Sequence, residues 1–139
     1  MNQNYIFLPC LALLFLSIVV LIRMFLTRVN AVRNGSVEMR YFKTYDMPVS
    51  TPSLMIQASR NFTNLFEVPT LFYMVCLFAL ITKNVDNIMY GAAWFYVILR
   101  CIHSAIHLTS NHIRQRMGVY TLSWIVLIFM AILLASRIF

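Results

Sequence analysis

Four long apolar runs alternate with short polar segments along the 139-residue chain. Each run reaches the roughly 20 residues that an α-helix needs to cross the hydrocarbon core of a bilayer. We therefore predict an all-α membrane protein, in which residues 1–139 form a single four-transmembrane-helix antiparallel bundle. The predicted helices cover residues of about 5–27, 54–82, 88–109 and 117–138.

The composition supports a membrane protein, because only 11% of the residues are charged and soluble domains average about 25%. The first run has no positively charged start and is too long for a signal peptide, so we expect it to be a retained helix. The three cysteines lie within apolar runs, without the spacing of a metal site or a CxxC pair. We treat these cysteines as small buried apolar residues.

The net charge of +7 is unevenly distributed. The first and third loops are rich in Lys and Arg, and the opposite side keeps only Lys83 and Arg137. The positive-inside rule therefore places the first and third loops in the cytoplasm and both termini on the opposite side. Nucleic-acid binding is not expected, because no basic patch is interleaved with aromatic residues on a soluble surface. The basic residues of these loops either determine the topology of the chain in the membrane or contact anionic lipid headgroups.

Two polar stripes interrupt the apolar runs. Arg60, Asn64 and Glu67 share a narrow face of the second predicted helix, and the third carries the stripe Arg100, His103 and His107. An ionisable group in a membrane helix costs roughly 2.5 to 3.5 kcal/mol, so such groups usually serve binding, catalysis or ion passage.

The loop between these two helices is short, so they should pack as antiparallel neighbours. Their stripes then match in depth as Arg60 with His107, Asn64 with His103, and Glu67 with Arg100. We expect Glu67 and Arg100 to neutralise each other, either as a buried ion pair that fixes the helix register or as part of a ligand site.

Each remaining polar residue admits two interpretations. Arg60 can bind an anionic ligand through its guanidinium fork or reach phospholipid headgroups. A metal at His103 and His107 is not expected, because no carboxylate lies beside them on that helix. On the fourth predicted helix Arg116 and Tyr120 share a face. They either line a binding site or are ordinary interfacial residues. In the second case Arg116 helps to set the membrane topology and Tyr120 belongs to the aromatic belt.

These stripes resemble the signature of the MAPEG family, the membrane-associated proteins in eicosanoid and glutathione metabolism. The resemblance is closest to the microsomal glutathione transferase and prostaglandin E synthase type. It covers nearly the whole chain, although relatives more often have tyrosine at the position of His107. The matching residues are Arg60, Asn64, Glu67 and Pro69, then Arg100, His103 and His107, then Arg116 and Tyr120.

The resemblance implies a homotrimer that binds glutathione, as co-substrate, between subunits near the cytoplasmic face. A lipophilic small-molecule substrate would arrive from the bilayer, and the reaction would be that of a transferase or peroxidase. By the same resemblance, Arg116 would stabilise the glutathione thiolate with Tyr120 beside it. The implied glutathione-binding residues are Arg60, Asn64, Glu67, Arg100, His103 and His107, with Arg28 from a neighbouring subunit.

Two other functions compete with this one. A non-enzymatic protein of the same fold could bind membrane lipids in the same groove, because fold alone does not establish catalysis. An ion conduit through Glu67, His103 and His107 is disfavoured, since the runs beyond these residues toward the outer leaflet are almost wholly apolar.

Overall fold

The computed structural model describes residues 2–45 and 51–139, and it contains four long α-helices. All four are long and apolar enough to span a membrane, so the protein is an integral membrane protein. The described residues contain no β-strand, and the predicted all-α class is confirmed. The long helices are α1 (Phe7–Arg33), α3 (Ser53–Ile81), α4 (Asn87–Leu108) and α5 (Ile113–Ile138); η1 (Gln3–Ile6) and α2 (Tyr41–Thr44) are short.

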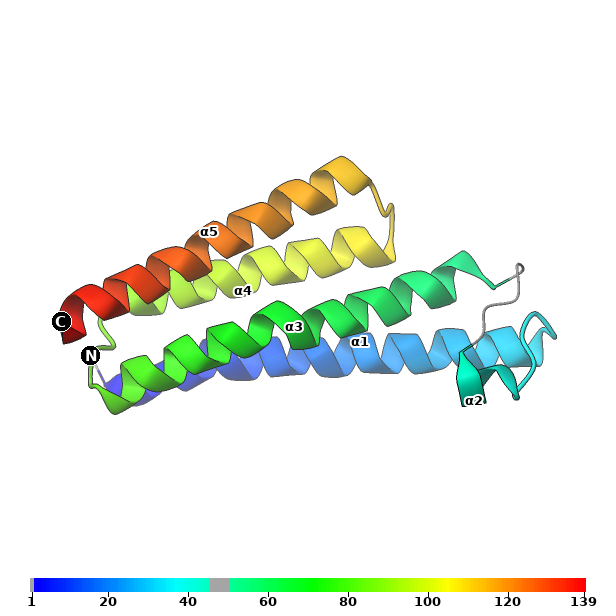
Figure 1. Ribbon diagram of the computed structural model, residues 1–139, viewed down its shortest axis with the longest axis horizontal. Helices are drawn as coiled ribbons and strands as arrows, with labels where there is room; N and C mark the ends of the chain where they lie inside the picture. The colour runs from blue at the N-terminus through cyan, green and yellow to red at the C-terminus, as the bar shows by residue number, and fades with distance from the viewer. Residues whose placement is uncertain (1, 46–50) are drawn as a thin grey trace.

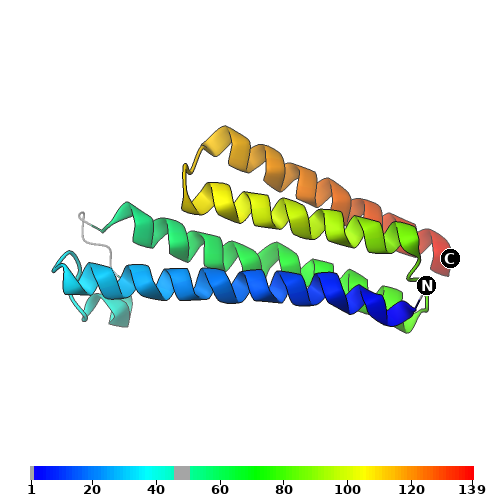
Figure 2. The same ribbon diagram turned by 180° about the vertical axis from the view of Figure 1, so that it is seen from behind.

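The long helices form two antiparallel pairs, α1 with α3 and α4 with α5, which make most of the interhelical contacts (Figure 1). Both termini and the α3–α4 connection lie at one end of the bundle, which we call the terminal end. The α1–α3 and α4–α5 connections lie at the other, which we call the loop end (Figure 2). Toward the loop end the α4–α5 pair diverges from the α1–α3 pair (Figure 1).

Polar contacts hold the terminal end together. The Gln3 side chain donates from Nε2 to the Val85 carbonyl over 2.9 Å, and its Oε1 accepts from the Val85 amide at 2.8 Å. Asp86 caps α4 by accepting from the Met89 amide at 2.8 Å, and its other oxygen pairs with Arg137 of α5 at 2.6 Å. The Met89 amide, followed by Arg137, lowers the pKa of Asp86. Three elements are thereby joined where the bundle is narrowest.

Large apolar residues fill the interior and also cover the outer surface. In the interior, Phe72 of α3 stacks on Tyr96 of α4 with ring centroids 4.5 Å apart and ring planes 8° apart. On the outside, side chains such as Phe15 and Ile132 are more than half exposed. A water-soluble bundle would not present so much continuous apolar surface. These outer side chains therefore contact lipid.

The register predicted between the two polar stripes is wrong. Arg100 donates from Nη2 to both the backbone oxygen of Asn64, at 3.2 Å, and the side-chain oxygen of Asn64. Ser104 donates to Asn61 at 3.2 Å. Pairing Glu67 with Arg100 displaced α4 along α3 by two to three residues, because the small polar residues Asn61 and Ser104 are the ones in contact between the two helices. Within the described residues Glu67 forms no ion pair, and its side chain is exposed.

Candidate functional site

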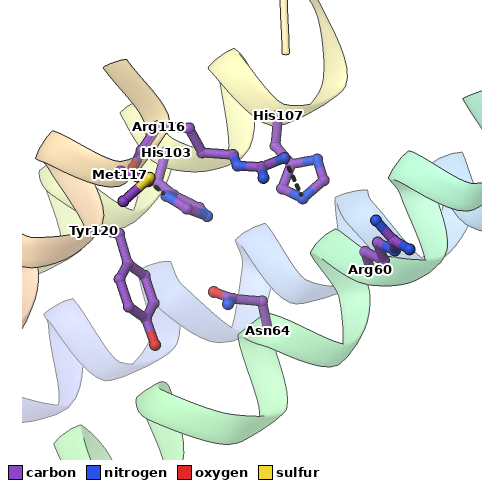
Figure 3. Close-up of a pocket in the computed structure, with 7 residues that line it drawn as sticks. All are labelled: Arg60, Asn64, His103, His107, Arg116, Met117 and Tyr120. Atoms are coloured by element: carbon purple, nitrogen blue, oxygen red, sulfur yellow. Dashed lines mark hydrogen bonds between the residues drawn. The ribbon is translucent and has the colours of Figure 1, made fainter. Parts of the chain in front are cut away.

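A cleft of about 280 Å³ lies between α3 and the α4–α5 pair, where the two helix pairs diverge (Figure 3). It is lined by Arg60 and Asn64 from α3, His103 and His107 from α4, and Arg116, Met117 and Tyr120 from α5. Every one of these except Met117 was a predicted site residue. Met117 was missed because a methionine carries no chemical signal, although it directly follows Arg116 in the sequence.

Arg116 is held at the loop end of the cleft by two acceptors. Its Nη1 donates to the Asn111 side-chain oxygen at 2.6 Å and lies 3.3 Å from Nε2 of His107 (Figure 3). Asn111 has a left-handed backbone (φ 48°) in the turn between α4 and α5, a conformation that asparagine tolerates well. This turn therefore fixes the guanidinium beside α4.

These contacts place a proton on Nδ1 of both histidines. A guanidinium can only donate, so Nε2 of His107 accepts and the ring is neutral with its proton on Nδ1. Nδ1 of His103 lies 3.2 Å from the Arg116 carbonyl, which can only accept, so that nitrogen carries a proton. Nδ1 of His107 and Nε2 of His103 are buried without a protein partner. A ligand in the cleft can supply the missing partners.

Behind the cleft, Arg100 is fully buried. Its Nε and Nη1 have no partner, and its guanidinium lies 5.7 Å from the centre of the Tyr120 ring. Burial of a cation without a carboxylate is costly. Glu67 is close enough for an electrostatic interaction with Arg100 but does not pair with it. The predicted Glu67–Arg100 ion pair is therefore absent from this chain.

Arg28 lies outside the cleft, in an adjacent pocket of about 150 Å³ that shares Arg60 as a lining residue. Its guanidinium sits 5.7 Å from the ring centres of Phe42 and Tyr45 and donates to Ser59 over 3.4 Å. The segment after α1 folds back onto that helix to make these contacts. In this chain Arg28 is thus an anchor for that segment.

The cleft has the chemistry of an anion site. Arg60 and Arg116 line it, Arg100 lies just behind, and its lining contains no carboxylate. Within the described residues no group of three or more acidic, histidine or cysteine side chains is placed to hold a metal ion. The available polar groups are therefore guanidinium donors, imidazole nitrogens, the Asn64 amide and the Tyr120 hydroxyl, which together suit a ligand with carboxylate and peptide groups.

A model of the MAPEG family matches residues 6–136. The chain belongs to the MAPEG family. This MAPEG protein matches no curated protein and no solved structure. The family includes glutathione-dependent transferases and other members. The matched region includes α1, α3, α4, all of α5 except its last two residues, and every residue of the cleft.

Proposed function

We propose that this protein is a membrane glutathione transferase or peroxidase that binds glutathione in the cleft. The observation that carries the proposal is the convergence of Arg60, Arg116, His103 and His107 on a lining without a carboxylate. Glutathione brings two carboxylates, two peptide groups and a thiol that becomes anionic during reaction. Each of these can accept a hydrogen bond from donors present in the cleft.

In this proposal Arg60, Asn64 and His107 bind the carboxylates and peptide groups. Arg116 then stabilises the thiolate, since a thiol with a pKa of about 8.5 is mostly protonated at neutral pH and a neighbouring guanidinium favours its anion. Tyr120 donates its hydroxyl proton to the same sulfur. Tyr120 is held between the His103 ring, 5.6 Å away, and the Arg100 guanidinium.

The second substrate is lipophilic and enters from the bilayer, because the outer faces of the helices around the cleft are apolar. In conjugation, the thiolate attacks an electrophilic carbon and the leaving group departs as an anion. In peroxide reduction, the thiolate attacks the terminal oxygen of a hydroperoxide and releases the alcohol; a second glutathione then yields glutathione disulfide, and water forms overall.

We further propose that the chain assembles as a homotrimer, with the loop end in the cytoplasm, where glutathione is available. The volume of about 280 Å³ is near the lower bound of roughly 300 Å³ for ligand pockets. A neighbouring subunit would enlarge and cover the cleft. The basic residues at the loop end support this orientation.

The test is glutathione-dependent turnover of an aryl halide and of a lipid hydroperoxide by the purified protein in detergent. Tyr120→Phe is the matched variant, since it keeps the ring against His103 and removes only the hydroxyl. We expect turnover by the wild type and a five- to fiftyfold lower rate in Tyr120→Phe with glutathione binding retained. Absence of turnover with every electrophile, despite saturable glutathione binding, would contradict catalysis.

A second candidate function is non-enzymatic lipid binding. One observation favours it: an apolar pocket of about 470 Å³ between α1 and the segment that follows it. Its lining includes Phe25, Val32 and Met39 together with Arg28 and Arg33. Lipid that remains bound through purification, with no effect of glutathione on its retention and no turnover, would favour this candidate.

A further inference from the structure

Two cysteines that are far apart in the sequence lie side by side in the fold. Cys10 is the fourth residue of α1, and Cys76 lies five residues before the end of α3 at Ile81. Their side chains are close enough to interact directly, and both thiols are free. The third cysteine, Cys101 of α4, is exposed, whereas its apolar run predicted burial. The spacing of the cysteines along the chain contains no signal of the pair, because the antiparallel packing of α1 on α3 creates it.

Tyr73 makes a second contact between the same parts of the two helices. It precedes Cys76 by three residues, so both side chains project from one face of α3. The Tyr73 hydroxyl donates to the Cys10 carbonyl over 3.5 Å. The face of α3 that carries Cys76 is therefore turned toward Cys10. The two thiols are held together by helix packing, independently of their own interaction.

The cysteine pair lines an apolar pocket of about 230 Å³. The polar groups in its lining are the two thiols and the Tyr73 hydroxyl. Cys10 is half-buried, whereas Cys76 is only 2% exposed. A molecule that enters the pocket therefore meets Cys10 first. The remaining lining residues are all apolar: Ile6, Phe7, Leu77 and Leu80.

The pair lies near one boundary of the membrane spans, at the terminal end. Three residues separate Cys10 from the start of α1, and five separate Cys76 from the end of α3. At 1.5 Å per residue these distances are about 5 to 8 Å. Polar groups on lipid chains gather near such a boundary, while the chains themselves stay in the apolar interior. The pocket therefore suits a lipid whose chain carries an oxidised group.

We propose that Cys10 and Cys76 form a redox-active dithiol site, which lipid hydroperoxides oxidise to a disulfide within one chain. The Cys10 sulfur attacks the terminal oxygen of the hydroperoxide and the O–O bond breaks. The lipid leaves as an alcohol that takes the thiol proton, and Cys10 becomes a sulfenic acid. The Cys76 sulfur then attacks the Cys10 sulfur, and the S–O bond breaks with release of water. Two electrons pass from the thiols to the hydroperoxide, and a small thiol reverses the oxidation by thiol–disulfide exchange.

The disulfide fastens α1 to α3 near the terminal end. It uses no residue of the glutathione cleft, so the two sites are chemically separate. In the orientation proposed above, the terminal end is on the non-cytoplasmic side, where disulfides persist more readily than in the cytosol. The inference rests on the contact between the thiols and does not require that orientation or glutathione binding.

Peptide mapping of the oxidised protein tests the site. The purified wild-type protein is reduced in detergent and treated with one equivalent of a fatty acid hydroperoxide in the absence of glutathione, and the remaining thiols are then alkylated. We expect a Cys10–Cys76 disulfide in the monomer band of a non-reducing gel. It should be at least about tenfold more abundant than any disulfide that contains Cys101, because a disulfide needs two closely placed cysteines. Absence of the Cys10–Cys76 disulfide after the hydroperoxide is consumed would overturn the inference, as would equal amounts of disulfides with Cys101.

Two serine variants test the order of the reaction. In Cys76→Ser the sulfenic acid at Cys10 has no second thiol to react with, so a cyclic dione should trap it. In Cys10→Ser the dione should label Cys76 at least about tenfold less, because a buried thiol is inert. Equal labelling of the two variants would overturn the assignment of Cys10 as the thiol that reacts first. Circular dichroism checks that both variants are folded, and failure of glutathione turnover would leave these results unchanged.

Discussion

Replacing Arg116 by alanine is the most informative perturbation of the proposed mechanism. The substitution removes the guanidinium whose Nη1 contacts Asn111 at 2.6 Å and His107 at 3.3 Å. It leaves α5 and the backbone carbonyl that faces His103 in place. The principal loss is therefore the positive charge beside the position that we propose for the glutathione sulfur.

The magnitude follows from the strength of a hydrogen bond to a charged group, about 1.5 to 3 kcal/mol. At 1.36 kcal/mol per decade, kcat/KM at pH 7 should fall about 10- to 150-fold. The loss should also depend on pH. In the proposed mechanism Arg116 lowers the pKa of the bound thiol, so the variant needs a higher pH to form the thiolate, and its deficit should shrink as the pH rises from 7 to 9.

The assay is conjugation of glutathione to an aryl halide over that pH range. Arg114→Ala is the matched control, because it removes an exposed arginine from the same helix but outside the cleft. We expect the control to remain within twofold of wild type. The reasoning is refuted if Arg116→Ala also stays within twofold, or if its deficit is constant with pH.

Three further predictions concern stability and the layer behind the cleft. Tyr96→Phe should raise the thermal midpoint in detergent, because it removes a fully buried hydroxyl without a hydrogen-bond partner. Burying such a hydroxyl costs about 1 to 3 kcal/mol. A lower midpoint would mean that the hydroxyl is paired. Asp86→Asn should keep the helix cap but lower the free energy of unfolding by less than about 1 kcal/mol at pH 7, because the ion pair with Arg137 is partly exposed. The pKa of Asp86 is lowered in the folded state by a backbone amide at the start of α4 and by Arg137, so this contribution is present above the ordinary carboxyl pKa. Thermal scans should show the difference between wild type and variant disappearing as the pH falls below about 4. Arg100→Met should leave the thermal midpoint unchanged or higher, since it replaces a buried cation that has no carboxylate partner. The same variant should bind glutathione about fivefold more weakly in calorimetry. An unaltered affinity would mean that Arg100 does not contribute to the site.

Much of the fold and the site could be predicted from the sequence, because a bilayer restricts the choices. Spanning helices must be long and apolar, so the four runs are visible directly. Polar residues at helical spacing within them are costly, so Arg60, Asn64, His103 and His107 could be recognised before their contacts were known. Arg116 and Tyr120 required the family resemblance, because interfacial arginine and tyrosine are common in any membrane protein.

The relative positions of the helices could not be predicted, because they depend on packing. Depth was assigned by pairing Glu67 with Arg100, but the contact of Asn61 with Ser104 sets the register of α3 against α4. The divergence of the two helix pairs has no signature in a single helix. The contacts of Arg28 with Phe42 and Tyr45 could not be predicted either, because they depend on how the segment after α1 folds back.

Calorimetric titration of glutathione into the detergent-solubilised protein tests the central claim most directly. The account predicts saturable binding by the wild type and by Arg114→Ala, and at least tenfold weaker binding by Arg60→Ala, whose side chain lines the cleft. Absence of saturable binding by the folded wild type, or equal affinity in all three proteins, would contradict the assignment of this cleft to glutathione.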